Sequence, residues 1–268
     1  MSTFDLAAYA ARIGAPVPDV IDLPALQRIH QAHVGAIAFE NLDVQWRRTI
    51  RIDPASVWHK LVESARGGYC FEHNTLLREV LRARGVPVTA REARVRSGAA
   101  TRRPRSHMML VVRIGDADYL CDTGFGAYTP LQPVPFDGEP CRQHDWTYRL
   151  TPEGALTVLQ WWRDGGWQDL YALEPGEPAD IDFEVANWFT CASPDSHFLS
   201  TLTAQRATPA TRYALRNYTL TEDARDTSFV RTLRRDEIVP VLRSVFGLEV
   251  DDSARFHALD GDARDGDA

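Results

Sequence analysis

The sequence predicts an α+β protein whose successive parts differ in secondary structure. Residues 1–86 carry apolar side chains at helical spacing, residues 87–185 show the short runs and alternation of strands, and residues 206–268 mix both patterns. Segment 186–205 is expected to be a helical connector. With 268 residues, of which 44% are hydrophobic, the chain can bury a large core.

Helix start and stop signals divide the first part into four expected helices. Asp53 and Pro54 form a typical helix start. Gly67 and Gly68 are expected to end the third helix, and Gly85 the fourth. The four predicted ranges are 3–14, 23–37, 53–68 and 70–85.

Six expected strands in the second part indicate an antiparallel barrel or sandwich. A hairpin turning at Gly115 and Asp116 would place position 109 opposite 122. His107 and Asp122 would then lie on one face as diagonal neighbours. The predicted strands are 88–96, 107–114, 118–122, 145–150, 155–163 and 167–173.

The third part is expected to mix strands and one helix. The helical pattern that leads into it spans residues 181–200, and the acidic, Gly-rich tail 259–268 is expected to be disordered. The predicted strands are 211–221 and 228–233, and the predicted helix is 235–248.

Composition excludes several classes of function. The net charge of -7 argues against a nucleic-acid partner, because phosphate contacts need a basic excess. No apolar run reaches the length of a membrane span, and the N-terminus lacks a signal-peptide pattern, so a cytoplasmic protein without a membrane partner is expected. Four scattered cysteines predict free thiols rather than disulfides, at positions Cys70, Cys121, Cys141 and Cys191.

One basic run departs from this acidic balance. It is interpreted either as a solvated loop or as a surface that attracts a phosphorylated cofactor. A single acidic residue, Glu92, interrupts its arginines, which are Arg91, Arg94, Arg96, Arg102, Arg103 and Arg105.

The stretch "RGGYCFEHN" predicts a nucleophile. At a helix start, free amide groups and the helix dipole favour the thiolate of Cys70. His73 lies one turn away but leaves little room for a substrate, whereas His107 could be oriented by Asp122. Each residue also has a structural explanation as core or turn. No metal site is expected, because "HQAH" at residues 30–33 lacks the zinc signature.

Five segments together resemble the arylamine N-acetyltransferase family, in the same order and at similar spacing. They cover most of residues 1–200, and the Cys-centred one is the most specific. The segments are "AFENLDV" near position 40, "RGGYCFEHN" around Cys70, "SHMMLVV" at His107, "YLCDTGFG" at Asp122 and "NWFTCASPDSHFLS" near position 190.

The resemblance implies a helical bundle, an antiparallel β-barrel and a C-terminal α/β lid. It also implies a Cys-His-Asp triad at Cys70, His107 and Asp122, with acetyl-CoA as acyl donor and an arylamine or hydrazine as acceptor. An apolar cleft would hold the acceptor, at the matching residues Phe39, Val95, Phe125 and Phe198.

The chain departs from the family's usual pattern at Ala38, Thr123 and Ala127 and in a shortened loop before His107. The last two changes bear on cofactor contacts more than on chemistry. Arg66 and Glu72 are expected to form a buried ion pair, and the protein is expected to be a monomer or a homodimer.

Three other functions use or mimic the same residues. A related amide synthase would close a macrolactam from a polyketide thioester with the same triad. A cysteine hydrolase would admit water to the thioester. A catalytically inactive binding module would keep Cys70 buried and protonated.

Overall fold

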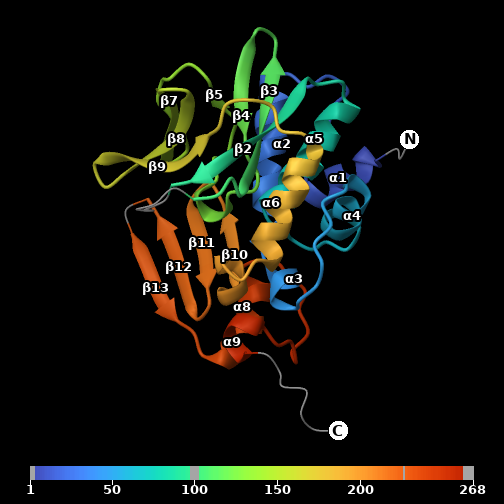
Figure 1. Ribbon diagram of the computed structural model, residues 1–268, viewed down its shortest axis with the longest axis vertical. Helices are drawn as coiled ribbons and strands as arrows, with labels where there is room; N and C mark the ends of the chain where they lie inside the picture. The colour runs from blue at the N-terminus through green and yellow to red at the C-terminus, as the bar shows by residue number, and fades with distance from the viewer. Residues whose placement is uncertain (1–3, 97–102, 226, 262–268) are drawn as a thin grey trace.

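The computed structural model of the chain describes residues 4–96, 103–225 and 227–261. Helices of the first part lie beside an antiparallel sheet, and a second, five-stranded sheet lies below them in Figure 1. The α+β class is confirmed. None of the helices in these ranges combines the length and the apolar character that crossing a membrane requires.

The helices of the first part begin at the residues that cap them. Asp22 accepts a hydrogen bond from the backbone N–H of Ala25 at 2.8 Å, and Asp53 accepts one from Ser56 at 3.0 Å. Gly85 adopts a φ of +70°, as a helix-ending glycine does. The helices are α1 (Leu6–Ile13), α2 (Leu23–Ala36), α3 (Leu42–Gln45), α4 (Pro54–Trp58) and α5 (Cys70–Ala83).

The predicted end of the third helix at Gly67 and Gly68 is wrong. α4 passes into a π-helical turn, η1 (His59–Glu63), and helical structure stops there. The two glycines are needed for close packing. A Cβ at Gly67 would lie 2.2 Å from the Ala38 carbonyl oxygen, and one at Gly68 would lie 2.6 Å from the Glu72 carboxylate.

The second part forms a nearly closed, eight-stranded antiparallel barrel. Its strands follow the order β5-β4-β3-β2-β9-β8-β7-β6, and its interior includes Met109, Tyr148, Leu159 and Tyr171. The sequence missed β5 and β6, because two or three residues are too short to show alternation. The strands are β2 (Val88–Val95), β3 (His107–Ile114), β4 (Ala117–Cys121), β5 (Val134–Pro135), β6 (Cys141–Gln143), β7 (Trp146–Glu153), β8 (Leu156–Arg163) and β9 (Gly166–Leu173).

The hairpin between β3 and β4 has the predicted register. Ile114 pairs with Ala117 and Leu110 pairs with Cys121, which is the register that the predicted hairpin required. Gly115 supplies the positive φ of +58° in the two-residue turn. The even-length loop therefore keeps His107 and Asp122 on one face.

The third part is a five-stranded sheet in the order β1-β10-β11-β12-β13. β1 belongs to the N-terminal part of the chain, yet Phe39 pairs with Gln205 of β10. The strand expected at 211–221 is instead a hairpin that turns at Asn217, whose φ is +51°. The strands are β1 (Phe39–Glu40), β10 (Thr203–Ala207), β11 (Thr211–Arg216), β12 (Thr219–Ala224) and β13 (Ser228–Thr232).

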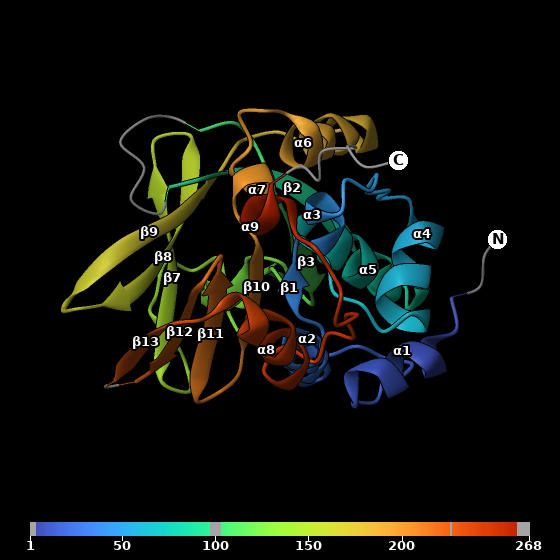
Figure 2. The same ribbon diagram turned by 90° about the horizontal axis from the view of Figure 1, so that it is seen from below.

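The expected helix 181–200 is two helices, because Ser193–Ser196 turn between them. Figure 2 shows α6 and α7 on one side of α5 and β1, with α1 and α2 on the other. The predicted disorder of the tail 259–268 is wrong at Leu259 and Asp260, which end α9 (His257–Asp260), and the part after position 261 lies outside the described residues. The domain boundaries stay predictions. The remaining helices are η2 (Gly126–Tyr128), α6 (Asp180–Ala192), α7 (His197–Ser200), η3 (Arg235–Glu237), α8 (Ile238–Ser244) and α9 (His257–Asp260).

Candidate active site

Cys70 is the first residue of α5, as the sequence predicted. Its neighbour Tyr69 has extended backbone, and the Tyr69 N–H donates a hydrogen bond to Glu72 at 3.0 Å. Cys70 is 6% exposed, and its Sγ lies 3.7 Å from the carbonyl oxygen of Ser106. The sulfur therefore sits between the start of a helix and the residue that precedes His107.

His107 and Asp122 meet in the interior. The Nε2 of His107 lies 2.7 Å from an Asp122 carboxylate oxygen, and the two residues are 3% and 0% exposed. Asp122 also accepts hydrogen bonds from the Tyr171 hydroxyl at 2.8 Å, the Asn74 amide at 3.0 Å and the Gly124 N–H at 2.9 Å. Four donors thus stabilise the charged form of a fully buried carboxylate.

Electrostatics of this pair favour an imidazolium beside a carboxylate. Burial lowers the pKa of His107, but the charge and hydrogen bond of Asp122, together with contact to Cys70, raise it to about 10. Burial raises the pKa of Asp122, whereas His107 and the other donors lower it below its ordinary value. Because Nε2 is held by Asp122, Nδ1 is the nitrogen left for Cys70.

Sequence reasoning missed Asn74 and Tyr171 as supports of Asp122. Asn74 also donates to the Met108 carbonyl at 2.8 Å and accepts from the Thr123 N–H at 3.1 Å. It lies four residues after Cys70, on the same helix face, and that spacing was the available signal. Tyr171 comes from β9 and carried no local signal.

Gly124 allows the loop after β4 to pack directly on Cys70. A Cβ at this position would lie 2.6 Å from the Cα of Cys70. His30 supports the same loop from α2, because its Nε2 accepts the Asp122 N–H at 3.1 Å. These contacts bring together three segments that are distant in the sequence.

His73 is not placed to act as a base toward Cys70. Its Nδ1 lies 3.0 Å from His33, and its Nε2 lies 3.1 Å from the Gly68 carbonyl oxygen. Both ring nitrogens are occupied within the core. Of the two candidate histidines, His107 is the one in contact with Cys70.

The four predicted acceptor residues fall into two neighbouring groups. The rings of Phe39 and Phe198 are 6.2 Å apart. Phe125 packs edge-on against His107 at 5.0 Å, and Val95 pairs with Tyr171 across β2 and β9. Of the four, Phe125 contacts a member of the proposed triad directly, and a role of these residues in acceptor binding stays a prediction.

The expected ion pair between Arg66 and Glu72 is wrong. Arg66 pairs with Glu40 at 2.8 Å and with Asp43 at 3.4 Å. Glu72 pairs with Lys60 at 2.7 Å, and Lys60 also reaches Asp43 at 2.6 Å. The corner before Cys70 is therefore held by a five-membered network of charges.

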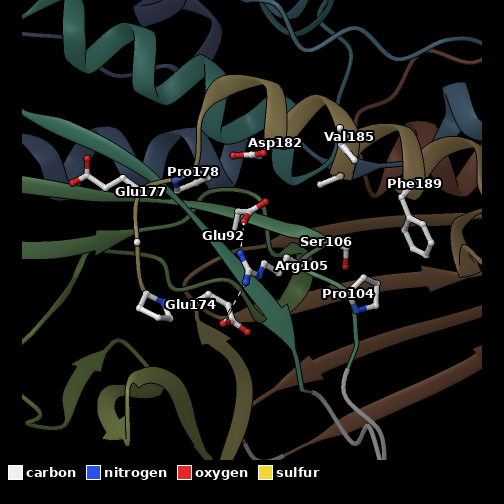
Figure 3. A pocket seen from close by; sticks show the side chains of 13 residues that line it. Glu92, Pro104, Arg105, Ser106, Glu174, Glu177, Pro178, Asp182, Val185 and Phe189 are labelled. Atoms are coloured by element: carbon white, nitrogen blue, oxygen red, sulfur yellow. Dashed lines mark hydrogen bonds and ion pairs between the residues drawn. The ribbon is translucent and has the colours of Figure 1, made fainter.

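A surface pocket of about 550 Å³ lies between α6 and the segment that leads into His107. Figure 3 shows Arg105 between Glu92 and Glu174, with Asp182 on the facing helix. The ion pairs of Arg105 measure 3.4 Å to Glu92 and 3.9 Å to Glu174. The pocket is lined by charged side chains together with apolar ones such as Val185 and Phe189, so it is not the purely apolar cleft that the resemblance implies.

Carboxylates neutralise much of the basic run. Arg96 pairs with Glu153 at 2.6 Å and with Asp169 at 3.0 Å, and Arg94 pairs with Glu174. Arg102 lies outside the described residues. The described part of the run thus offers less free charge to a phosphorylated cofactor than its sequence suggests. Among the described residues, no group of three or more His, Cys, Asp or Glu could hold a metal ion.

Two comparisons of the sequence with known proteins point to one family. A family profile described as N-acetyltransferase matches residues 22–255. An arylamine N-acetyltransferase of Mycolicibacterium smegmatis is 34% identical, with 93% of this chain and 94% of that protein covered.

Solved structures extend the match to the fold. The arylamine N-acetyltransferase of Salmonella typhimurium superposes with a TM-score of 0.87 at 32% identity, covering 94% of each chain. The Mycobacterium marinum arylamine N-acetyltransferase in complex with CoA superposes with a TM-score of 0.85 at 32% identity, covering 91% of this chain and 93% of that one. With its family match, its relatives and its fold in agreement, the chain belongs to the arylamine N-acetyltransferase family.

Proposed function

We propose that this protein transfers an acetyl group from acetyl-CoA to the nitrogen of an arylamine or arylhydrazine through an acetyl thioester on Cys70. The observation that carries the proposal is the position of His107, held at 2.7 Å by Asp122 and in contact with Cys70. The relatives' names support the reaction, and the CoA complex of the Mycobacterium marinum protein supports the donor.

In the first half-reaction, the Cys70 thiolate attacks the thioester carbonyl carbon of acetyl-CoA. A carbon–sulfur bond forms to Cys70, the bond to the CoA sulfur breaks, and His107 gives its proton to the departing thiolate. Backbone amides at the start of α5 stabilise the oxyanion. Asp122 keeps the ring oriented and stabilises its charge without taking the proton.

In the second half-reaction, the amine nitrogen attacks the acetyl carbon and loses a proton to neutral His107. The carbon–sulfur bond to Cys70 breaks, and the thiolate and the imidazolium are restored. Arylamines suit this step, because they are neutral at pH 7 and need no prior deprotonation. Phe39, Phe125, Val95 and Phe198 form the apolar wall for the acceptor in this proposal.

Burial of the site favours transfer over hydrolysis. Cys70 is 6% exposed, and the rings of Phe125 and Tyr171 cover His107 at 5.0 and 4.7 Å. Restricted access of water would let the acetyl thioester persist until an amine arrives.

We further propose that the enzyme lies in the cytoplasm, as a monomer or a homodimer. Its four free cysteines agree with a reducing compartment.

Intact-protein mass spectrometry after mixing with acetyl-CoA tests the proposal. One acetyl group should appear on the wild type and not on Cys70→Ala, and addition of 4-methylaniline should discharge it as the N-acetyl product. Cys191→Ala is the matched control, since Cys191 is also a free thiol, and it should acetylate normally. Absence of an adduct on the wild type would refute the proposal. Loss of the adduct to water as fast as to the amine would favour a hydrolase.

A further inference from the structure

A chain of buried hydrogen bonds lies behind the Cys70 corner and takes no part in the steps above. The Tyr9 hydroxyl of α1 lies 2.9 Å from Nδ1 of His33 in α2. Nε2 of His33 lies 3.0 Å from Nδ1 of His73 in α5. All three residues are 0% exposed. Polar groups so deep in the core need a reason to be there, because burial is costly without partners.

The direction of each hydrogen bond follows from the carbonyl end. The oxygens of Gly68 and Ala38 can only accept, so the proton of His73 lies on Nε2 and its Nδ1 accepts from Nε2 of His33. Nδ1 of His33 then has no proton and accepts from the Tyr9 hydroxyl. Burial lowers the pKa of His73 to about 4 and that of His33 well below 6.5, so both rings stay neutral in this arrangement.

The hydrogen-bond chain ends at two backbone carbonyls, one in the segment before Cys70 and one in the segment before Phe39. Nε2 of His73 lies 3.1 Å from the Gly68 oxygen and 3.2 Å from the Ala38 oxygen. The same oxygens join the two segments, since Glu40 N–H donates to Gly68 at 2.7 Å and Gly68 N–H donates to Ala38 at 3.3 Å. Gly68 lies two residues before Cys70, and Ala38 directly precedes Phe39.

We propose that Tyr9, His33 and His73 are positioning residues that hold the segment before Cys70 against β1. They thereby set the distance between Cys70 and Phe39 of the acceptor wall. The proposal rests on the proposed function for its catalytic consequence. A single, fully satisfied chain of hydrogen bonds has one low-energy arrangement, which apolar packing alone would not specify. Small displacements of a nucleophile are costly, since about 1 Å of misplacement can slow a reaction about 100-fold.

Three single variants and one control test this chain of hydrogen bonds. His73→Leu removes the link to both carbonyls, His73→Gln keeps a donor for them, and Tyr9→Phe removes only the first donor. Gln143→Leu is the matched control, because Gln143 is 1% exposed and makes two hydrogen bonds to the Gln132 backbone in the barrel. The measured quantities are the rate of CoA release at saturating acetyl-CoA, the KM for 4-methylaniline and the melting temperature.

We expect His73→Leu to slow CoA release about 10- to 100-fold and to raise the KM for the amine. His73→Gln should recover most of the rate, Tyr9→Phe should slow it at least threefold, and Gln143→Leu should lower only the melting temperature. The double variant Tyr9→Phe/His73→Leu should be no slower than His73→Leu alone, because both changes break one chain.

A rate for His73→Leu within twofold of the wild type, with a loss of melting temperature like that of Gln143→Leu, would overturn the proposal. If His73→Leu does not fold, an unchanged rate for Tyr9→Phe would overturn it equally. Alkylation of Cys70 by iodoacetamide separates the two proposals. If acetyl-CoA leaves the wild type unmodified, the proposed function fails, whereas slower alkylation in Tyr9→Phe would still support the positioning role.

Discussion

Replacing Asp122 by Asn tests the electrostatics of the site most directly. The change keeps the size of the side chain and removes the charge beside His107, whose Nε2 lies 2.7 Å away. The rise of the His107 pKa from 6.5 to about 10 corresponds to on the order of 5 kcal/mol in favour of the charged ring. Without the carboxylate, burial still lowers the pKa of His107 and only the contact with Cys70 still raises it, so we expect the pKa to fall below about 8.

The amide also reverses the hydrogen bonds. If its NH₂ group faces His107, Nε2 must become an acceptor, and the proton moves to Nδ1, which faces Cys70. If it turns the other way, it opposes the donors of Asn74 and Gly124. In serine triads the same change costs about 10⁴-fold in kcat. We therefore expect acetylation of Cys70 to slow about 10³- to 10⁴-fold, or ~4 to 5.5 kcal/mol in the barrier.

Stopped-flow measurement of CoA release gives the rate, and the titration of the His107 ring by NMR gives its pKa. Asp118→Asn is the matched control, since Asp118 pairs with Arg113 at 2.8 Å near the turn of the same hairpin and lies away from the site. It should leave both quantities unchanged. An Asp122→Asn rate within tenfold of the wild type, or a ring still charged at pH 8, would refute the reasoning.

Stability should depend on pH with a defined sign. The raised pKa of His107 contributes stability that is complete below pH 6.5 and is lost as pH rises towards 10. The lowered pKa of Asp122 contributes stability that is complete above about pH 4 and is lost as pH falls further. The melting-temperature difference between the wild type and Asp122→Asn should thus be largest between about pH 4 and 6.5. A difference that grows above pH 7 would contradict this account.

Three further predictions concern the supports of the site. Gly124→Ala should lower the free energy of unfolding by about 1 to 3 kcal/mol in urea titrations and slow CoA release, because its Cβ would lie 2.6 Å from the Cα of Cys70. An unchanged stability would show that the loop relaxes freely. Lys60→Met should lower the free energy of unfolding by about 3 to 5 kcal/mol in the same titration, since it removes the partner of the Glu72 carboxylate, which is 1% exposed. A loss under 1 kcal/mol would contradict a buried ion pair. Tyr171→Phe removes one of the four donors to Asp122 and should slow acetylation less than about tenfold, whereas a loss as large as that of Asp122→Asn would mean that the tyrosine holds the carboxylate alone.

Local patterns in the sequence were sufficient to predict most of the helices and the longer strands of the barrel. The start of α5 at Cys70 could be predicted because glycines, a cysteine and a helical repeat lie next to one another. The register between His107 and Asp122 could be predicted because a two-residue turn fixes which positions face each other. In both cases the deciding interactions lie within about 15 residues along the chain.

Contacts between distant segments were beyond that reach. No local sequence pattern indicated that Arg66 would pair with Glu40 and Asp43 rather than with Glu72. The choice of partner depends on how β1 packs against the two glycines before Cys70. The role of Tyr171 was equally hidden, since it reaches Asp122 only through the closure of the barrel.

The sequence by itself determined the α+β class, the helix that begins at Cys70 and the hairpin that aligns His107 with Asp122, because periodicity and turn geometry act between near neighbours. Only the tertiary structure decided which histidine faces the thiol. His73 is nearer in sequence, but its ring nitrogens are taken by His33 and the Gly68 carbonyl, while His107 arrives from the barrel. Buried polar groups must find partners, and which partners they find depends on how helices, barrel and sheet pack together.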